Sequence, residues 1–485
     1  MAAFMSSDFQ LLYRAIAEQI ANQIEAGLYR EGERLPSVRA LAKTHEVSAT
    51  TAARVLIELE QNGFVEARAR SGFYVTSRTG AGNTPSATRT APIPASAKVN
   101  ELIGRIFRAT ISTGAARPVM PLGAAELDEA LLPHKELAVA VARAVREGGA
   151  SLLAYGHRNG DPDLRRRIVH ILGLRGVSLV PDDIVVTTGE SEALGLALMA
   201  LTSPGAAVAV ESPCFFGILQ WIETLGLRAV EIATDPHRGI DIDELERIAE
   251  ATPLAALALN PTFHNPFGFA MPPEAMRRLM SVVERHRLPV IEDDVYGELH
   301  HAGRVRSPLK SFDREGWVFY CSSFSKTLAP GFRIGWCVPG RFGENLERVR
   351  APCNAGVTTL TQRALAVYLD GRAYRRHLDG LRRLFGAQAS AIRKLVLESF
   401  PIGTLISEPG GGFVFWVEIP APFDVMRFSE LANAEGISIA PGPIFSASGG
   451  FDNAFRLSVG RRLTPDVDAA IRSLGRIAVE MKTGR

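Results

Sequence analysis

From about residue 99 onwards, short apolar runs alternate with stretches of helical character. Six runs have the length of buried strands, and we expect helices to follow them: DIVVTTG, AAVAVESP, LAALALNPTF, LPVIEDDVY, WVFYCSSFS and RIGWCVPG. Apolar runs separated by helices are typical of parallel strands covered on both faces, so this region is predicted to form a mainly parallel α/β sheet. Ligands bind such sheets at the strand ends, which makes polar residues there the first candidates for a site.

The first part of the chain follows a different pattern. Residues 9–27 carry apolar side chains at helical spacing, and Ser37 and Ser48 each stand where a serine would cap a further helix. Two short runs, residues 64–69 and 72–76, then form a predicted hairpin. Helix, helix, turn, helix and hairpin is the order of a winged helix-turn-helix, an α+β domain whose second paired helix enters the major groove of DNA.

Residues 9–76 resemble the DNA-binding domain of the GntR family of bacterial transcription regulators, through GERLPS, VSATT, LEQNGFVEAR and SGFYV. The resemblance implies contacts with DNA from seven residues: Arg39, Ser48, Thr50, Thr51, Arg54, Arg68 and Arg70. Many family members have arginine at the positions of Ala49 and Ala53, so the base-reading set stays open.

The charge of this domain leaves an alternative. Residues 1–78 contain nine cationic and nine anionic side chains, whereas DNA-binding domains usually have a basic excess. Binding is compatible with a neutral total if the cations gather on the groove face, as Arg39, Lys43, Arg54, Arg68 and Arg70 are expected to do. The alternative is a winged helix that contacts only protein.

Residues 77–98 are rich in Gly, Pro, Ser, Thr and Ala and are predicted to be a flexible linker. Such a linker spans about 25 Å, enough to reach a neighbouring subunit. The chain as a whole has a net charge of +2, no apolar run near the ~20 residues of a membrane span, and no pattern of a signal peptide. Its four scattered cysteines lack metal-ligand spacing, so we expect no metal site, no membrane and a reducing cytoplasm.

The segment SSFSKTLAPGFRIGW, residues 322–336, has the layout that a cofactor aldehyde requires. Lys326 is predicted to form a Schiff base with pyridoxal 5'-phosphate, since burial and nearby charge turn a lysine into a neutral nucleophile. Ser323, Ser325 and Arg333 would hold the phosphate through hydroxyl groups and a planar guanidinium. Taken alone, the segment also fits an ordinary loop lysine with serine neighbours.

Further candidates stand at the strand ends. Gly189-Glu190-Ser191 opens a helix after a strand, where backbone N–H groups bind phosphate, and Phe215 is placed to stack on the pyridine ring. Asn265 and Tyr296 are expected at the ring's phenolic oxygen, and Asp293 at the pyridine nitrogen, which a carboxylate keeps protonated. On a late strand, Arg456 would grip a substrate carboxylate with two hydrogen bonds.

In this order, the candidates make residues 100–480 resemble the fold-type I pyridoxal-phosphate enzymes, the aminotransferase superfamily. The resemblance implies a smaller C-terminal α+β subdomain from about residue 370 to 485, and a dimer in which Tyr155 reaches the partner's cofactor. The whole chain is similar to the MocR subfamily of regulators. The implied domains are a DNA-binding head (9–76), a linker (77–98) and an aminotransferase-like body (99–485).

Three functions are open at this point. The first is a transcription regulator that senses an amine, an amino acid or the cofactor itself through external aldimine formation at Lys326, Asp293 and Tyr296. Binding of this ligand would change how the paired DNA-binding heads are placed at a promoter. The second is an active aminotransferase with an accessory DNA-binding domain. The third is a degenerate body that only dimerises, which the complete set of site residues disfavours.

Overall fold

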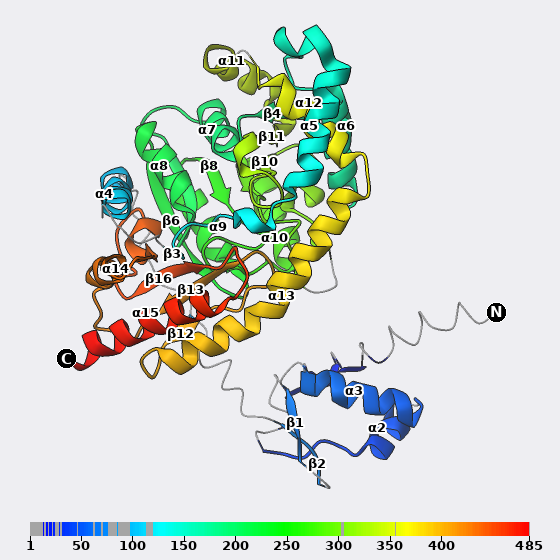
Figure 1. The fold of residues 1–485 in the computed structure, drawn as a ribbon, viewed down its shortest axis with the longest axis vertical. Coiled ribbons are helices and arrows are strands. Elements are labelled where there is room, and N and C mark those ends of the chain that lie inside the picture. The colour runs from blue at the N-terminus through cyan, green and yellow to red at the C-terminus, as the bar shows by residue number, and fades with distance from the viewer. Residues whose placement is uncertain are drawn as a thin grey trace. The chain divides into compact units, whose positions relative to one another are not determined.

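The computed structural model divides the chain into two compact units, residues 1–83 and 84–485, here called the head and the body (Figure 1). It describes residues 13, 16–17, 19–21, 23–24, 29, 32–45, 47–61, 64–68, 71–75, 85, 98–112, 120–301, 305–354 and 356–484. Most of the predicted linker and parts of the predicted first helix lie outside these residues.

The head has the predicted order of elements. Helix α2 (Val38–Thr44) begins after Ser37, whose hydroxyl accepts a hydrogen bond from Ala40 N at 3.3 Å. Helix α3 (Ala49–Gln61) begins after Ser48, whose hydroxyl accepts from Thr51 N at 3.1 Å. Strands β1 (Val65–Arg68) and β2 (Gly72–Val75) pair antiparallel. The apolar sides of these elements share one core with the described helical residues of the first segment: Tyr13, Ile16, Ala17, Ile20, Ala21 and Ile24.

The body is built on an eight-stranded sheet with the order β4-β11-β10-β9-β8-β5-β6-β7. The four central pairs, from β10 to β6, are parallel, which confirms the mainly parallel sheet. The strands are β4 (Val185–Thr187), β5 (Ala207–Ser212), β6 (Arg228–Asp235), β7 (Gly239–Ile240), β8 (Leu254–Leu259), β9 (Val290–Asp293), β10 (Val318–Ser323) and β11 (Gly335–Val338).

One expected connection is wrong. The predicted scheme places a helix after each apolar run, but β10 leads to β11 through one turn of 3-10 helix at Pro330–Phe332, and the two strands pair antiparallel. The connecting loop carries Lys326 and Arg333, so the chain uses it for the site instead of a crossover helix. Strand β6 was not predicted. Like the six predicted runs, it is a stretch of consecutive buried residues rather than an alternation of buried and exposed ones.

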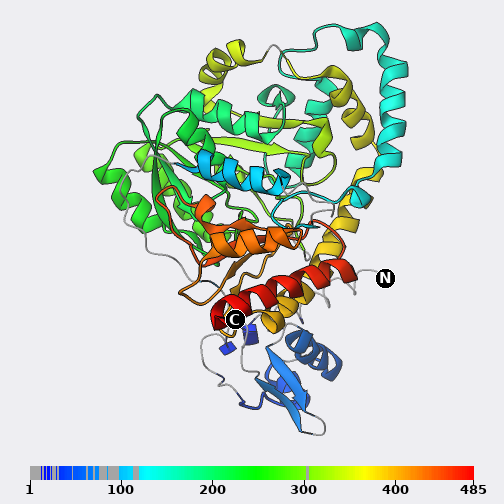
Figure 2. The same ribbon diagram turned by 60° about the vertical axis from the view of Figure 1, so that its left-hand side comes forward.

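Helices cover both faces of the sheet (Figures 1 and 2). One face shares a core with α7 (Glu190–Leu201), α8 (Phe216–Thr224), α9 (Ile242–Ala251), α10 (Pro273–His286) and α11 (Gly343–Cys353). The other face packs against α5 (His134–Gly148), α6 (Pro162–Gly173), α12 (Thr359–Leu369) and the first part of α13 (Ala373–Ser399). Neighbouring residues such as Val185 and Val186 belong to opposite cores, as the pleat of a strand requires.

A second, antiparallel sheet with the order β12-β13-β16-β15 forms a smaller subdomain with its own core. Its strands are β12 (Leu405–Ile406), β13 (Val414–Glu418), β15 (Ala440–Pro441) and β16 (Ala454–Ser458), and its helices are α14 (Val425–Ala434) and α15 (Pro465–Thr483). Helix α15 lies beside α13 in both ribbon views (Figures 1 and 2).

The first described residues of the body join this subdomain to the large sheet. Strand β3 (Met120–Pro121) pairs in parallel with β14 (Ile437–Ser438). Helix α4 (Val99–Ser112) packs on α8 and α14. Among the helices that the structure describes, none combines the length and the apolar composition needed to cross a membrane.

Candidate functional site

The strand ends of the large sheet and parts of the smaller subdomain surround a cavity of about 320 Å³. The structure brings most of the predicted body residues together in its wall: Glu190, Ser191, Phe215, Asn265, Asp293, Tyr296, Ser323, Ser325, Lys326, Arg333 and Arg456. They come from six strands or the loops after them, so the fold gathers residues that are far apart in the sequence.

Lys326 lies in the loop after β10 with its amine inside the cavity. Its Nζ donates a hydrogen bond to the carbonyl oxygen of Ala125 at 2.6 Å. Burial is the main influence on this amine and lowers the pKa of Lys326, while the nearby Glu190 carboxyl opposes that change. A lowered pKa increases the neutral fraction of the amine, which is the form that attacks a carbonyl carbon.

One end of the cavity suits an anion. Gly189 precedes α7 with φ 80°, and a Cβ atom there would lie 2.4 Å from Nη2 of Arg333. Arg333 adopts φ 51°, an unusual conformation for a residue with a side chain, and donates from Nη2 to the Thr188 carbonyl at 3.3 Å. Ser323 and Ser325 lie in the same cavity wall as Arg333. The N-terminus of α7, the two serine hydroxyl groups and the Arg333 guanidinium therefore face the same end of the cavity.

Two further polar groups line the cavity, Asp293 and Tyr296. Asp293 ends β9, and its carboxylate accepts a hydrogen bond from Val295 N at 3.2 Å. Burial raises the pKa of Asp293, and a cationic ligand beside it would favour its ionised form. The buried hydroxyl group of Tyr296 has no hydrogen-bond partner in the described part of the chain, and burial raises its pKa as well. A ligand with a cationic edge and an acceptor oxygen would satisfy both groups.

Arg456 on β16 is buried without a carboxylate partner among the described residues. Its Nη1 donates to Asn265 Oδ1 at 2.9 Å and its Nη2 to the Gly123 carbonyl at 2.6 Å, while Nε has no acceptor among the residues that the structure describes. Burial lowers the pKa of Arg456 to about 10. The guanidinium carbon lies 5.2 Å from the ring centre of Phe445. An anionic ligand would offset the cost of burying this charge.

Sequence reasoning missed Asn260, which links two site residues. Its Nδ2 donates to the Asp293 carbonyl at 2.5 Å, and its Oδ1 accepts from Asn265 N at 2.6 Å. Its own N–H donates to Oε2 of the buried Glu211 at 2.6 Å. The signal was present, because Asn260-Pro261 precedes the similar pair Asn265-Pro266 by five residues.

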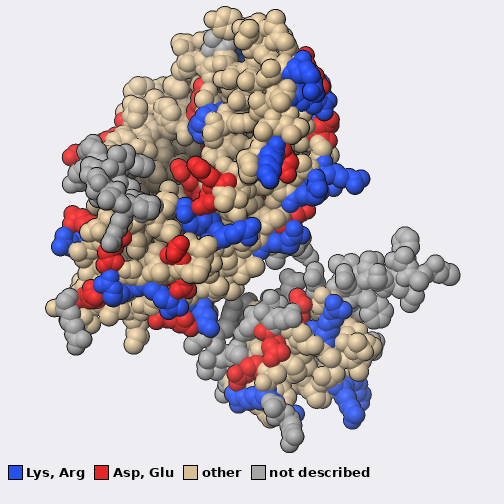
Figure 3. All heavy atoms as spheres, viewed as in Figure 1, with Lys and Arg blue, Asp and Glu red and all other residues tan. Residues whose placement is uncertain are grey.

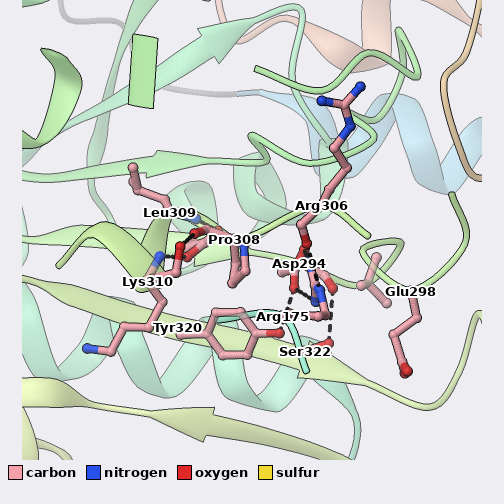
Figure 4. A network of polar contacts seen from close by, with 12 residues as sticks. Arg175, Asp294, Glu298, Arg306, Pro308, Leu309, Lys310, Tyr320 and Ser322 are labelled. Carbon is pink, nitrogen blue, oxygen red and sulfur yellow. Dashed lines mark hydrogen bonds and ion pairs between the residues drawn. The ribbon is translucent and has the colours of Figure 1, made fainter. Parts of the chain in front are cut away.

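A network of polar contacts fixes the segment after β9 (Figure 4). Arg175 pairs with the carboxylate of Asp294, and the hydroxyl of Tyr320 donates to Asp294 Oδ2 at 2.6 Å. Ser322 Oγ donates to the Asp294 carbonyl oxygen at 3.0 Å. Because Asp294 follows Asp293 directly, the network determines the direction in which the Asp293 side chain leaves the strand.

The cavity also has walls that the sequence did not indicate. Ile103 and Ile106 of α4 line it, as do Gly123–Glu126 and Ser438–Ala440. A Cβ atom on Gly123 would lie 2.5 Å from the backbone carbon of Ile439, so this small residue permits the close approach of the two segments. The run Gly123-Ala124-Ala125 was the available signal for such an approach.

Tyr155 is not brought to this cavity within the chain. Its side chain is 92% exposed, and it does not contribute to the cavity wall. The expected contact with a partner's cofactor therefore stays a prediction.

The predicted metal-free character also stays a prediction. Among the described residues, Glu246, Glu250 and His286 bring ligand atoms within 4.8 Å of one another. Arg285 already forms an ion pair with Glu246 and would compete with a metal ion there. We assign no function to this group.

In the head, the residues expected to meet DNA differ in exposure. Arg39, Ser48, Thr50, Arg54 and Arg68 are exposed, whereas Arg70 lies outside the described residues. Thr51 is buried, and its hydroxyl is 2.8 Å from that of Ser48, which favours a structural role at the start of α3.

Two of the exposed head arginines already have neighbours. The guanidinium of Arg54 lies 4.9 Å from the ring centre of Tyr13. Arg68 forms an ion pair with Glu66 at 2.8 Å and lies 4.5 Å from the ring centre of Tyr74. Figure 3 shows cationic and anionic side chains together on the visible face of the head, in agreement with its neutral total charge.

Comparison with known proteins identifies both units. The model of bacterial regulatory proteins of the gntR family matches residues 12–75, and that of class I and II aminotransferases matches residues 117–474. Two uncharacterized HTH-type transcriptional regulators of Escherichia coli, YjiR and YdcR, are each 33% identical to the chain. Both alignments cover 96% of this chain, together with 98% of YjiR and 99% of YdcR. The chain belongs to the MocR subfamily of GntR-type regulators.

The body of this MocR-type chain also matches solved structures. LysN, the alpha-aminoadipate aminotransferase of Thermus thermophilus, solved in complex with N-(5'-phosphopyridoxyl)-L-leucine, aligns with a TM-score of 0.71. The match is 28% identical and covers 80% of this chain and 98% of LysN. The fold is therefore that of an aminotransferase of class I and II.

Pyridoxal 5'-phosphate, the cofactor expected from the sequence, fits the cavity residues of this MocR-type body. The anion-binding end would hold the phosphate. The Tyr296 hydroxyl and the Asn265 amide would bind the phenolic oxygen, and Asp293 would bind the protonated ring nitrogen. Lys326 presents an amine of lowered pKa between these groups. The polar groups of the cavity thus match the polar atoms of the cofactor in kind.

Proposed function

We propose that this protein is a cytoplasmic transcription regulator that binds pyridoxal phosphate and senses an amine or amino acid in its body. The observation that carries the proposal is a set of cofactor-compatible residues around Lys326 in a chain that also has a GntR head. The full-length relatives with the same two parts are HTH-type regulators by name, whereas an aminotransferase relative, the 2-aminoadipate transaminase of Thermus thermophilus, covers 71% of the chain.

Bound pyridoxal phosphate supplies an aldehyde that condenses with amines and a ring that withdraws electrons when its nitrogen is protonated. Asp293 would hold that proton through its buried carboxylate. Lys326, whose pKa is lowered by burial, would hold the cofactor until an effector amine competes with it. Arg333, Ser323, Ser325 and the backbone at Gly189–Ser191 would orient the phosphate.

Arg456 would select the effector. A buried guanidinium without a carboxylate partner favours an anionic group, and a carboxylate fits its planar donors with two hydrogen bonds. Leucine, the amino acid that forms part of the compound bound to LysN, has both an amine and a carboxylate. These points support an amino acid as the effector of this chain.

The head would bind promoter DNA through α3 and the β1–β2 wing, with Arg39, Ser48, Thr50, Arg54, Arg68 and Arg70 at the interface. We propose a homodimer with two heads and two half-sites. The exposed Tyr155 supports this assembly, because it is free to reach the cofactor of a partner subunit. Effector binding in the body would change the placement of the heads by stabilising one arrangement over another.

An active aminotransferase is the second candidate. Its support is that the cavity has the acid, the lysine and the guanidinium that amino-group transfer needs, in the fold of that family. Binding and turnover share these residues, so only a measurement of product separates the two functions.

The experiment that tests the proposal is a titration of the purified, cofactor-loaded protein with a panel of amines and amino acids, followed by visible absorbance. We expect a visible band from cofactor bound at Lys326, and a saturable change in that band with one class of amine. Lys326→Ala is the control and should lack the band. A wild-type protein that shows no band when supplied with pyridoxal phosphate would overturn the proposal.

A further inference from the structure

The side chain of Glu190 has no role in the proposed function. The sequence assigns a function only to its backbone, at the N-terminus of α7. Its side chain is 9% exposed and lies in the wall of the cavity. Its Oε1 has no hydrogen-bond partner, and no arginine or lysine forms an ion pair with it among the described residues. A buried carboxyl beside a phosphate-binding end therefore needs an explanation.

The nearest explanation is the carboxyl group of Asp293. The two buried carboxyl groups line the same cavity, and a side-chain hydrogen bond between them contributes to the pKa of each. Two carboxylates at such a distance cannot both ionise at neutral pH without a large cost, so one of them keeps a proton and donates it to the other. Burial, with Asp293 as the next cause, holds the pKa of Glu190 well above its usual range.

The surroundings decide which carboxyl keeps the proton. Asp293 and Asp294, from the end of β9, add negative charge, and Tyr296 follows them. The loop after β10 contributes the Lys326 amine, β10 contributes the buried thiol of Cys321, and the start of β11 brings Arg333 to the same cavity. Asp293 has a donor in Val295 N and is the residue placed for a cationic ring nitrogen. The proton therefore belongs on Glu190.

We propose that Glu190 is a positioning residue for the cofactor: its neutral carboxyl group donates a hydrogen bond to Asp293 and keeps the pair at a single negative charge. This inference rests on the proposed function, because it assumes that the cavity receives pyridoxal phosphate. The bond to Asp293 fixes that carboxylate toward the ring nitrogen. Because Glu190 is neutral, it also does not repel the negatively charged phosphate at the start of α7.

The proposal gives cofactor binding a specific dependence on pH. Binding that requires a proton on Glu190 is unaffected below the raised pKa of this group. Above it, the association constant falls by about tenfold per pH unit, since the free protein must first take up a proton. Glu190→Gln carries a neutral donor at every pH and removes this dependence. The opposite direction would follow if an ionised Glu190 were needed.

The test uses pyridoxine 5'-phosphate, which has an alcohol in place of the aldehyde and cannot condense with Lys326. Its affinity for the full-length wild-type protein and for Glu190→Gln is measured by calorimetry from about pH 6 to about pH 9. Ionisation of the phosphate itself affects both proteins equally and cancels in the ratio of their affinities. Glu274→Gln, in the first turn of α10 and outside the cavity, is the control for a lost acidic residue at a helix start.

We expect the ratio of the association constants of Glu190→Gln and wild type to rise with pH. The logarithm of this ratio, plotted against pH, should approach a slope of about one. The ratio for Glu274→Gln should stay constant. A constant ratio for Glu190→Gln would overturn the role of Glu190 and leave the proposed function intact. Failure of every protein to bind pyridoxine phosphate or pyridoxal phosphate would remove the proposed function as well. If Glu190→Gln unfolds, Glu190→Ser provides a smaller neutral donor for the same comparison.

Discussion

At the scale of single residues, burial determines what the charged groups of the cavity can do. Lys326 has a lowered pKa because it leaves water, and Arg456 has one for the same reason. The residue types of the cavity were predictable from the sequence, since Lys326 and Asp293 stand at the ends of apolar runs and Arg456 lies on a late strand. The contacts of Asn260 and the proposed side-chain role of Glu190 could not be predicted, because they join segments that lie far apart in the sequence.

Arg456→Gln should weaken binding of an amino acid more than binding of the matching amine that lacks the carboxyl group. Hydrogen bonds to a charged group contribute about 1.5–3 kcal/mol, so we expect a loss of roughly 10- to 150-fold for the amino acid. The amine reports any change that the substitution causes at Asn265, which also contacts Arg456. Absorbance titrations of both probes check the prediction, and equal losses for the two probes would contradict it.

At the scale of elements, local signals predicted the head better than they predicted the connections of the body. Ser37 and Ser48 cap α2 and α3 as expected, because N-capping depends on residues within one turn. The connection from β10 to β11 was predicted wrongly, because its path depends on the antiparallel backbone pairing of these two strands. Ile103 of helix α4 lines the cavity because of tertiary packing, which no local sequence pattern indicates.

Ser48→Ala should destabilise the start of α3 by about 1 kcal/mol, because the N–H of Thr51 loses its acceptor. Hydrogen exchange of the α3 amides in the full-length protein would measure this as faster opening. Ser48→Asp keeps an acceptor at the cap and is the matched control. Equal exchange rates in Ser48→Ala and in the wild type would show that the cap does not hold the helix.

At the scale of the whole molecule, the chain combines a head of zero net charge with a body whose cavity suits a cofactor. The sequence predicted this combination because two separate motif sets, one for each unit, occur in one chain. The effector could not be predicted in the same way. The cavity that would receive it is lined by residues such as Ile106 and Ile439, which only the fold brings together.

Arg39→Ala and Arg68→Ala should each weaken promoter binding and reduce the salt dependence by about one unit in the log–log slope, if each side chain neutralises one phosphate. The ion pair of Arg68 with Glu66 is exposed and weak, so it does not prevent such a contact. Arg247→Ala, on α9 of the body, removes the same charge away from the head. Binding that all three variants leave unchanged would favour a head that contacts protein.

The most direct test of the central claim measures promoter affinity and keto-acid production in the same samples. The full-length protein, loaded with pyridoxal phosphate, is given the amine or amino acid that changes its absorbance most. A sensor signals by occupancy, so we expect a shift in DNA affinity that saturates with the absorbance change, and little or no keto acid over many binding times. Fast multiple turnover with a DNA affinity that does not depend on the amine would contradict the account and identify an enzyme.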